Sequence, residues 1–174
     1  MQGYFRDLAA TRSVTTPDGW LDTGDMGYLM NGELVITGRS KDLIICNGRN
    51  IWPHDLEWAV ERLDGIRPGD VAAFSVERDG DGEKVIVVIE CREASLAAQQ
   101  ILRQVARAAV QRVAGIECEI VLATPGSLTF TTSGKLSRAA AKAKYLGAAI
   151  RDVAAPAEGT NQRPELQQIY AVAS

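Results

Sequence analysis

The chain has 174 residues, a formal net charge of −3 and 46% hydrophobic residues, which is enough for one compact domain with a sizeable core. Its acidic and basic side chains are interleaved, without the basic block that binds phosphate backbones, and we therefore expect no nucleic-acid partner. No segment reaches the ~18 apolar residues of a membrane helix, and the cysteines show no metal-ligand spacing, so we expect a cytoplasmic protein with reduced thiols and no metal site.

The N-terminal region is predicted to be a connecting segment followed by a β-hairpin. Residues 1–25 are rich in Thr, Gly, Pro and Asp and lack hydrophobic periodicity, which is typical of a connection. Two short apolar runs, 27–30 and 33–37, flank Asn31-Gly32. That dipeptide is typical of a type I′ turn, so the two runs are predicted to pair as antiparallel strands.

A further strand and a helix are predicted next in the chain. The apolar run 43–46 precedes Asn47-Gly48, which can supply the positive φ values of a second tight turn. Pro53 is suited to the first turn of a helix because its missing N–H costs nothing there. Apolar residues then recur at helical spacing until Gly65, so this helix is expected to lie on a sheet.

The central region predicts two paired strands and a long helix. The β-branched runs 71–76 and 84–91 flank a polar turn at 79–82, which favours an antiparallel pair. Ser95 is a suitable N-cap for a helix that ends at Gly115. The predicted apolar stripe of this helix consists of Leu102, Val105, Ala109 and Val113.

The last predicted elements complete a small α+β domain. Residues 117–122 alternate as a strand, and the alanine-rich segment 139–146 is predicted to be helical. After Gly147 the composition predicts a flexible tail or linker over 148–174, with one possible short helix at 164–173. The expected fold is therefore an N-terminal β-hairpin and a mixed or antiparallel sheet packed by about three helices.

Three groups of polar residues are candidates for chemistry. Lys135 follows Gly134 in a hydroxyl-rich loop; the spacing is not that of a Walker A loop, so composition alone favours a solvated lysine. Asp25 could accept two hydrogen bonds from a diol or simply cap a turn. The run 38–42 reads alone as a solvated connection, and His54 has no partner at metal-ligand spacing.

Taken in order, these fragments resemble the adenylate-forming superfamily of acyl-CoA synthetases, peptide-synthetase adenylation domains and luciferases. The stretch Gly3-Tyr4-Phe5-Arg6-Asp7, followed by Asp18 to Asp25, resembles the end of the large N-terminal domain of that superfamily. Gly38-Arg39-Ser40-Lys41-Asp42 resembles its hinge, and Ser133 to Arg138 resembles its catalytic lysine loop. The stretches 48–57 and 67–76 look most like the fatty acyl-AMP ligase branch, from which Ile51-Trp52 and His54 depart.

The resemblance implies a domain division and a role for each matching residue. Residues 1–37 would be the end of the large domain with its leading hairpin, and 38–147 the C-terminal lid, with the hinge near Lys41. Lys135 would be the catalytic cation. Asp25 and Arg39 would bind ATP or AMP. The loop containing Gly48, Arg49 and Asn50 would face the acceptor of the acyl group.

The same resemblance implies substrates and partners. A lid of this kind serves an ATP-dependent ligase that activates a fatty acid as its adenylate, with ATP and Mg²⁺ held mainly by the N-terminal adenylation domain of the same polypeptide. Transfer to an acyl carrier protein thiol is the expected second step. The alternatives are the lid of a fatty acyl-CoA ligase and a non-catalytic module that docks a carrier protein. Alone, the chain is expected to be inactive.

Overall fold

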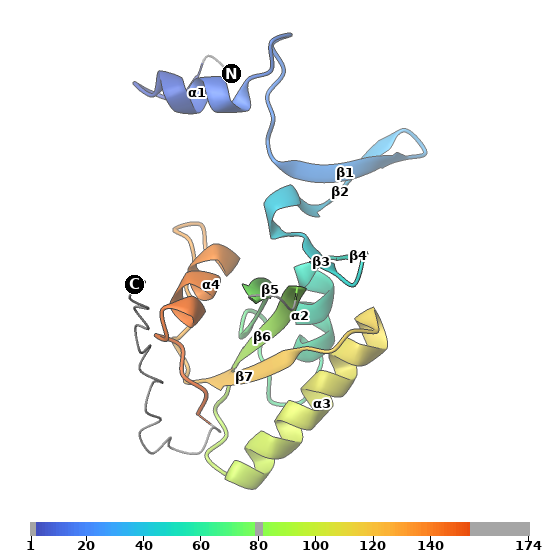
Figure 1. Cartoon of the computed structure of the whole chain (residues 1–174), viewed down its shortest axis with the longest axis vertical. Helices are drawn as coiled ribbons and strands as arrows, with labels where there is room; N and C mark the ends of the chain where they lie inside the picture. The colour runs from blue at the N-terminus through green and yellow to red at the C-terminus, as the bar shows by residue number, and fades with distance from the viewer. Residues whose placement is uncertain (1–2, 79–81, 154–174) are drawn as a thin grey trace, which may run out of the picture.

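The computed structural model describes residues 3–78 and 82–153 (Figure 1). Four α-helices, seven strands and one 3₁₀ turn follow one another within these residues. They are α1 (Leu8–Val14), β1 (Asp25–Met30), β2 (Glu33–Arg39), η1 (Ser40–Asp42), β3 (Ile44–Cys46), β4 (Arg49–Ile51), α2 (Pro53–Glu61), β5 (Val71–Arg78), β6 (Gly82–Glu90), α3 (Leu96–Ala114), β7 (Glu119–Ala123) and α4 (Arg138–Leu146). The predicted α+β class with a leading hairpin is confirmed.

The main sheet has the order β5-β6-β7 and is mixed. β5 pairs with β6 in antiparallel register, as predicted, and β6 pairs with β7 in parallel register. The parallel pair requires a crossover connection, which α3 supplies. β6 is central, and its residues from Val85 to Glu90 are all buried, as expected for a strand with neighbours on both edges and helices on both faces.

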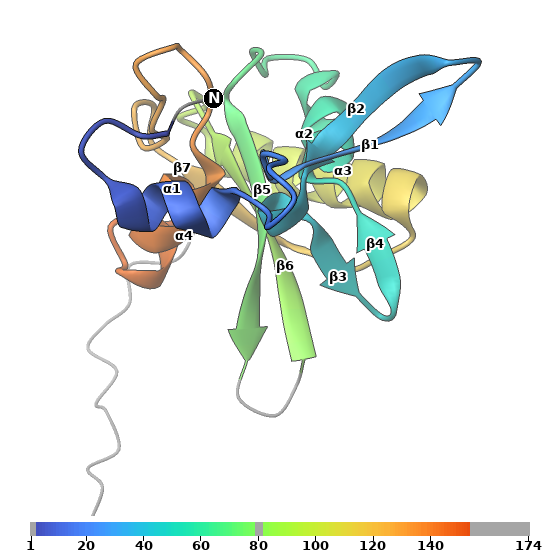
Figure 2. The ribbon, with the colours of Figure 1, turned by 90° about the horizontal axis from the view of Figure 1, so that it is seen from above.

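Each face of the main sheet is covered by helices (Figure 1, Figure 2). On one face, alternate residues of the strands pack with α2 and α3, for example Val87 with Leu56 and Val110. On the other face, Val88 belongs to a second cluster with Ala141 of α4. The strand period of two therefore divides one sheet between two cores.

The apolar stripe of α3 differs from the predicted one. Val105 and Val113 are 41% and 54% exposed, so their placement on the buried stripe was wrong. Leu102 and Ala109 are buried as predicted, and the other apolar core positions of the helix are Ala106, Val110 and Ala114. Small alanine side chains let the backbone of α3 lie close to the sheet. The buried positions of this helix are therefore those nearest the sheet, and not those with the largest apolar side chains.

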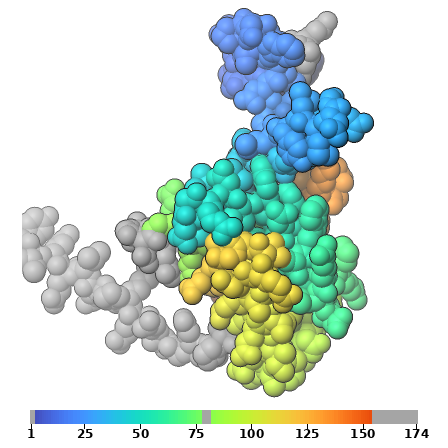
Figure 3. Space-filling view, turned by 90° about the vertical axis from the view of Figure 1, so that its right-hand side faces the viewer, coloured from blue at the N-terminus to red at the C-terminus, as the bar shows by residue number. Residues whose placement is uncertain are grey.

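The N-terminal residues form a helix and a hairpin that project from the body of the domain (Figure 3). The hairpin has the predicted turn, with φ of 54° at Asn31 and 85° at Gly32. Within the predicted connection 1–25 the chain forms α1, a helix that the sequence analysis did not predict and that Asp7 caps by accepting a hydrogen bond from the Ala10 N–H. None of the residues of α1 is buried, so no apolar stripe marked this helix in the sequence.

The domain continues past α4 instead of ending at 147. Ile150 is buried in the cluster beneath α4, and Val153 packs on the opposite cluster. The Val153 N–H donates to the Leu122 carbonyl over 2.7 Å, and Asp152 pairs with Arg103. The prediction of a flexible tail was therefore wrong for 148–153. The remainder of that tail, including the possible helix at 164–173, and residues 79–81 of the predicted turn lie outside the described residues.

Candidate active site

The end of the β1–β2 hairpin brings two of the candidate residues together. Asp25 and Arg39 are direct partners across the ladder, and the Arg39 Nε lies 3.2 Å from the Asp25 Oδ1. Asp25 does not cap the preceding turn; that carboxylate is Asp22, which accepts from the Gly24 N–H. The Asp25 carboxylate is thus held by a neighbouring cation while it remains partly open to solvent.

The candidate lysine lies at the tip of a loop whose base is fixed. Glu90, at the end of β6, is buried and accepts a hydrogen bond from the Leu128 N–H over 2.8 Å. Leu128 and Leu136 pack on the core beneath α4. Thr131 closes the tip, because its N–H donates to the Lys135 carbonyl and its hydroxyl accepts from the Lys135 N–H. Lys135 itself is exposed, and its ammonium pairs with no other described side chain.

One cleft of about 690 Å³ joins the lysine loop to the segment after the hairpin. Lys135 lines it together with Arg39 and Lys41. Trp52 and His54 form part of its wall. Three residues proposed separately from the sequence therefore face a single space, with Asp25 attached to it through Arg39.

The charges of this cleft leave two cations without a countercharge. Arg39 is neutralised by Asp25, and Arg138 is paired with carboxylates. Lys41 and Lys135 form no ion pair with any described residue. Two uncompensated ammonium groups on one cleft attract anions, so phosphate or carboxylate groups are the ligands that it favours.

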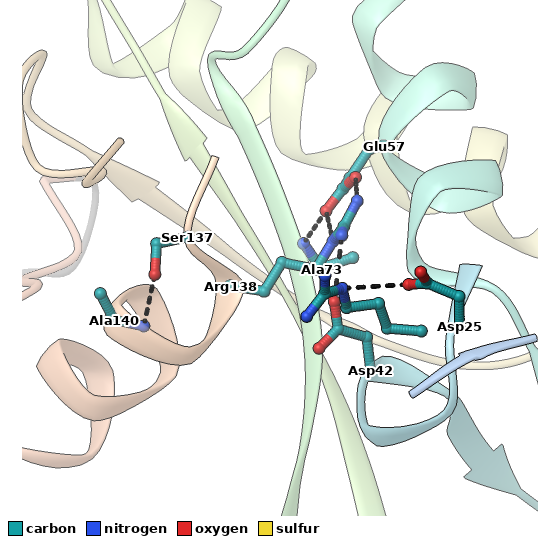
Figure 4. A network of polar contacts seen from close by, with 8 residues as sticks. Asp25, Asp42, Glu57, Ala73, Ser137, Arg138 and Ala140 are labelled. Carbon is teal, nitrogen blue, oxygen red and sulfur yellow. Dashed lines mark hydrogen bonds and ion pairs between the residues drawn. The ribbon is translucent and has the colours of Figure 1, made fainter. Parts of the chain in front are cut away.

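Arg138 forms an ion-pair network behind the cleft that the sequence analysis missed (Figure 4). Its Nε and Nη2 donate to the two oxygens of Glu57 over 2.7 and 2.5 Å, and its Nη1 lies 3.3 Å from the Asp42 Oδ2. Hydrogen bonding to Glu57 raises the pKa of Arg138 above its ordinary value, against the opposing effect of burial. The Glu57 Oε1 also accepts from the Ala73 N–H. The network connects α2, α4, β5 and the η1 turn.

A signal for this network was present in the sequence. Glu57 lies four residues after Pro53 and three before Val60, and both of these neighbours are buried. A glutamate on the apolar stripe of a helix is buried only when a partner compensates it, so the position predicts a cation. The spacing could not identify that cation as Arg138, because the two residues are 81 positions apart.

The residues expected to face the acceptor lie elsewhere on the domain. Gly48, Arg49 and Asn50 belong to the tight turn and strand of the β3–β4 hairpin, of which the sequence predicted only the first strand. None of the three lines the cleft of Lys135. The Arg49 Nη1 donates to the Ala114 carbonyl over 2.6 Å, so this side chain ties the hairpin to the last turn of α3.

Three further observations concern metal sites, the surroundings of His54 and membrane spans. Within 3–78 and 82–153, no three or more His, Cys, Asp or Glu side chains gather where they could hold a metal ion. His54 is stacked on Trp52, with ring centroids 6.0 Å apart, and lies 3.7 Å from the Asp55 carboxylate. Among the helices of the described ranges, none has the length and apolar character needed to span a membrane.

This chain matches its curated relatives over most of its own length and over a small part of theirs. A protein of Caulobacter vibrioides whose name assigns it to the acyl-CoA synthetases is 44% identical over 153 residues, or 87% of this chain and 27% of that protein. The long-chain-fatty-acid–AMP ligase FadD26 of Mycobacterium marinum is 41% identical over 138 residues, 75% of this chain and 23% of its own. The chain spans about a quarter of the length of these relatives. No family model matches it.

Solved structures share the fold. One from the fatty acyl-adenylate ligases of E. coli and L. pneumophila superposes with a TM-score of 0.74 at 42% identity, over 86% of this chain and 26% of that chain. McyG, solved as an A-PCP unit complexed with phenylalanyl-adenylate, superposes with a TM-score of 0.74 at 29% identity, over 84% of this chain and 23% of its own. Both likenesses extend across most of the described elements.

Proposed function

The chain belongs to the adenylate-forming superfamily as a domain of its C-terminal type, and on that premise we propose that it is the catalytic lid of an ATP-dependent fatty acyl-AMP ligase. The observation that carries the proposal is the cleft in which Lys135 meets Arg39 and Lys41. The relative named as a long-chain-fatty-acid–AMP ligase supports the acyl substrate. Residues 1–37 then end the large domain, and 38–147 with the packed segment 148–153 form the lid.

Lys135 is proposed to be the catalytic cation. Adenylation brings a fatty-acid carboxylate against the α-phosphate of ATP, so two anions must approach, and an ammonium between them relieves the repulsion. At ~4 Å and an effective dielectric near 20, the attraction is roughly 4 kcal/mol, which is on the order of a thousandfold in rate if it acts only in the transition state. An exposed, unpaired ammonium on a well-anchored loop is suited to this role.

The other residues are proposed to bind and position. The Asp25 carboxylate has lone pairs for both ribose hydroxyls of ATP, and Arg39 would orient it and contact the ribose or phosphate. Lys41, in the exposed η1 turn, is the proposed hinge. Mg²⁺ would neutralise the phosphates and would be held mainly by the N-terminal adenylation domain of the same polypeptide, together with most of the nucleotide.

The acceptor of the acyl group is proposed to be the thiol of an acyl carrier protein. Gly48, Arg49 and Asn50 lie away from the cleft of Lys135, which supports a second arrangement of the lid in which the β3–β4 hairpin faces the adenylate. Coenzyme A is the alternative acceptor. Offering the purified full-length ligase both acceptors at equal concentration, and comparing the rates of thioester formation, distinguishes them.

A substitution of Lys135 tests the assignment. We expect Lys135→Ala in the full-length ligase to slow acyl-adenylate formation by roughly a thousandfold, with a much smaller effect on transfer from preformed adenylate. Pyrophosphate release measures the first step, and thioester formation from added acyl-adenylate measures the second.

Lys142→Ala is the matched control for charge. This lysine lies on α4, outside the cleft that Lys135 lines, so its loss should leave both steps near the wild-type rates. Equal losses in the two steps of Lys135→Ala would contradict a role in adenylation.

A further inference from the structure

The segment Gly38–Asp42, which we call the hinge segment, is attached at both of its ends. At its last residue, the Asp42 carboxylate is paired with Arg138, which is itself held by Glu57 of α2. Between the ends, Arg39, Ser40 and Lys41 are exposed. The middle of the segment is attached to the start of β1, because Arg39 pairs with Asp25 and the Ser40 N–H donates to the Gly24 carbonyl over 2.9 Å. The contact at Gly38 and the ion pair at Asp42 are the ones that join the segment to the body of the domain.

Gly38 is in contact with the side chain of Trp52. A Cβ atom built on Gly38 would lie 2.7 Å from the Cζ3 and 2.8 Å from the Cε3 of the Trp52 ring, closer than real Cβ atoms approach other heavy atoms. The φ of Gly38 is 150°, in a region that residues with a side chain rarely adopt. The backbone of the hinge segment therefore lies directly against the indole ring, and only glycine permits this approach.

The Trp52 ring is held by residues that pack into the core of the domain. Trp52 is the residue before α2, and its two neighbours, Ile51 and Pro53, are buried and fix its backbone. Its ring stacks on His54 with an angle of 22° between the planes. α2 in turn packs into the core through Leu56, which is fully buried. Trp52 therefore connects the residue that it contacts to the core of the domain.

We propose that Trp52 is a positioning residue that holds the first residue of the hinge segment in the arrangement in which Lys135 and Arg39 share one cleft. The inference rests on the proposed function, because it assigns Trp52 a place in the movement of that lid. Loss of the ring removes the contact of Gly38 with α2 and its flank, and it leaves the Asp42–Arg138 pair as the side-chain contact that joins the segment to the body of the domain. Adenylation, which needs Lys135 in this arrangement, then slows relative to transfer.

Tryptic cleavage of the full-length ligase reports the state of the hinge segment directly, because Arg39 and Lys41 are exposed trypsin sites within it. A protease cuts a segment at a rate set by how often the segment opens. We expect Trp52→Ala to raise the initial rate of cleavage after Arg39 and Lys41 roughly 10-fold, read by mass spectrometry, and Trp52→Phe to restore it to within about 2-fold of wild type.

Two controls separate a hinge contact from general loosening. Trp58→Ala removes the other indole that packs on His54, with ring centroids 4.8 Å apart, and this ring does not line the cleft. If the contact of Trp52 with Gly38 is what holds the segment, this variant should leave cleavage of the hinge segment unchanged. Cleavage after Arg107, on the exposed side of α3, should stay at the wild-type rate in Trp52→Ala. Equal acceleration at Arg107 and at the hinge segment, or in Trp58→Ala and Trp52→Ala, would overturn the proposal.

A second variant keeps the test decisive if Trp52→Ala does not fold. Gly38→Ala introduces the Cβ that the ring excludes, and it should also raise cleavage of the hinge segment; wild-type cleavage in this variant overturns the contact. In the kinetic arm, Trp52→Ala should lower the ratio of adenylation to transfer about 5-fold. An unchanged ratio overturns the positioning role. If Lys135→Ala leaves adenylation intact while Trp52→Ala opens the hinge segment, the proposed function fails and the contact stands.

Discussion

Replacement of Arg138 by methionine perturbs the ion-pair network that connects the lysine loop, α2 and the hinge segment. Methionine keeps most of the length of the arginine stem and removes its three polar contacts to Glu57 and Asp42. The Glu57 side chain is only 6% exposed, so its carboxylate would lose both arginine nitrogens and keep only the Ala73 N–H. Arg138→Met should therefore destabilise the domain strongly.

The size of the effect follows from the burial of the two partners. Removing one partner of a buried pair costs about 3–5 kcal/mol because it leaves an uncompensated charge. Arg138 is 25% exposed, so water can reach the vacated space, and we expect a loss of about 3 kcal/mol, at the lower end. The raised pKa of Arg138 keeps the guanidinium charged well beyond ordinary pH, so the pair is not lost on its arginine side as pH rises to 10.

Urea unfolding of the chain, followed by far-ultraviolet circular dichroism, measures this loss as a shift in the midpoint. Glu57→Gln is the matched partner substitution, because the amide oxygen can still accept from the Ala73 N–H. We expect the double variant to lose about 1–2 kcal/mol less than the sum of the two single variants, since it leaves no buried charge. Additive losses, or a loss in Arg138→Met below about 1 kcal/mol, would refute the reasoning.

Two further predictions concern the opposite end of the domain. Arg49→Met removes the hydrogen bond to the Ala114 carbonyl and should cost about 1 kcal/mol in urea unfolding. Arg112→Met, at an exposed position in the last turn of α3, should cost only about 0.3 kcal/mol, the small contribution of a cation at a helix C-terminus. Equal losses in the two variants would contradict a stabilising role for the Arg49 hydrogen bond. Burial raises the pKa of the Cys118 thiol from 9.0 to about 11, so at pH 8 its thiolate is about 100-fold scarcer than in the unfolded chain, and alkylation should be slower by that factor. The same shift removes stability as pH rises from 9.0 to about 11, and alkylation of native Cys118 at the unfolded rate would disprove it.

Local signals predicted the elements that depend on local chemistry. Asn31-Gly32 identified the first hairpin because few dipeptides accept two positive φ values. Ser95 and Gly115 marked the ends of α3, and both act there as caps. The parallel pairing of β6 with β7 was not readable, because it depends on how a long helix returns the chain across the sheet. The short strand β4 was missed because three residues carry too little pattern.

The candidate site was selected by resemblance and not by local chemistry. Composition alone favoured solvated positions for Lys135 and for the run 38–42, and their order, matched to the superfamily, selected Lys135, Arg39 and Lys41. Their common cleft arises from folding. Glu57 and Arg138 were not selected, because their partnership spans a sequence distance that no periodicity covers. The contact of Trp52 with Gly38 is also nonlocal. It can be found only by asking what a side chain at the glycine would meet.

The short segment 148–153 has a consequence for engineering chimeric ligases. Its two large apolar side chains pack on opposite faces of the sheet, Ile150 beneath α4 and Val153 on the cluster that contains α2 and α3. A recombination junction at the end of α4 would uncover both cores at once. Junctions, fusion partners and engineered protease sites should therefore follow Val153, so that the transferred domain keeps both side chains that cover its cores.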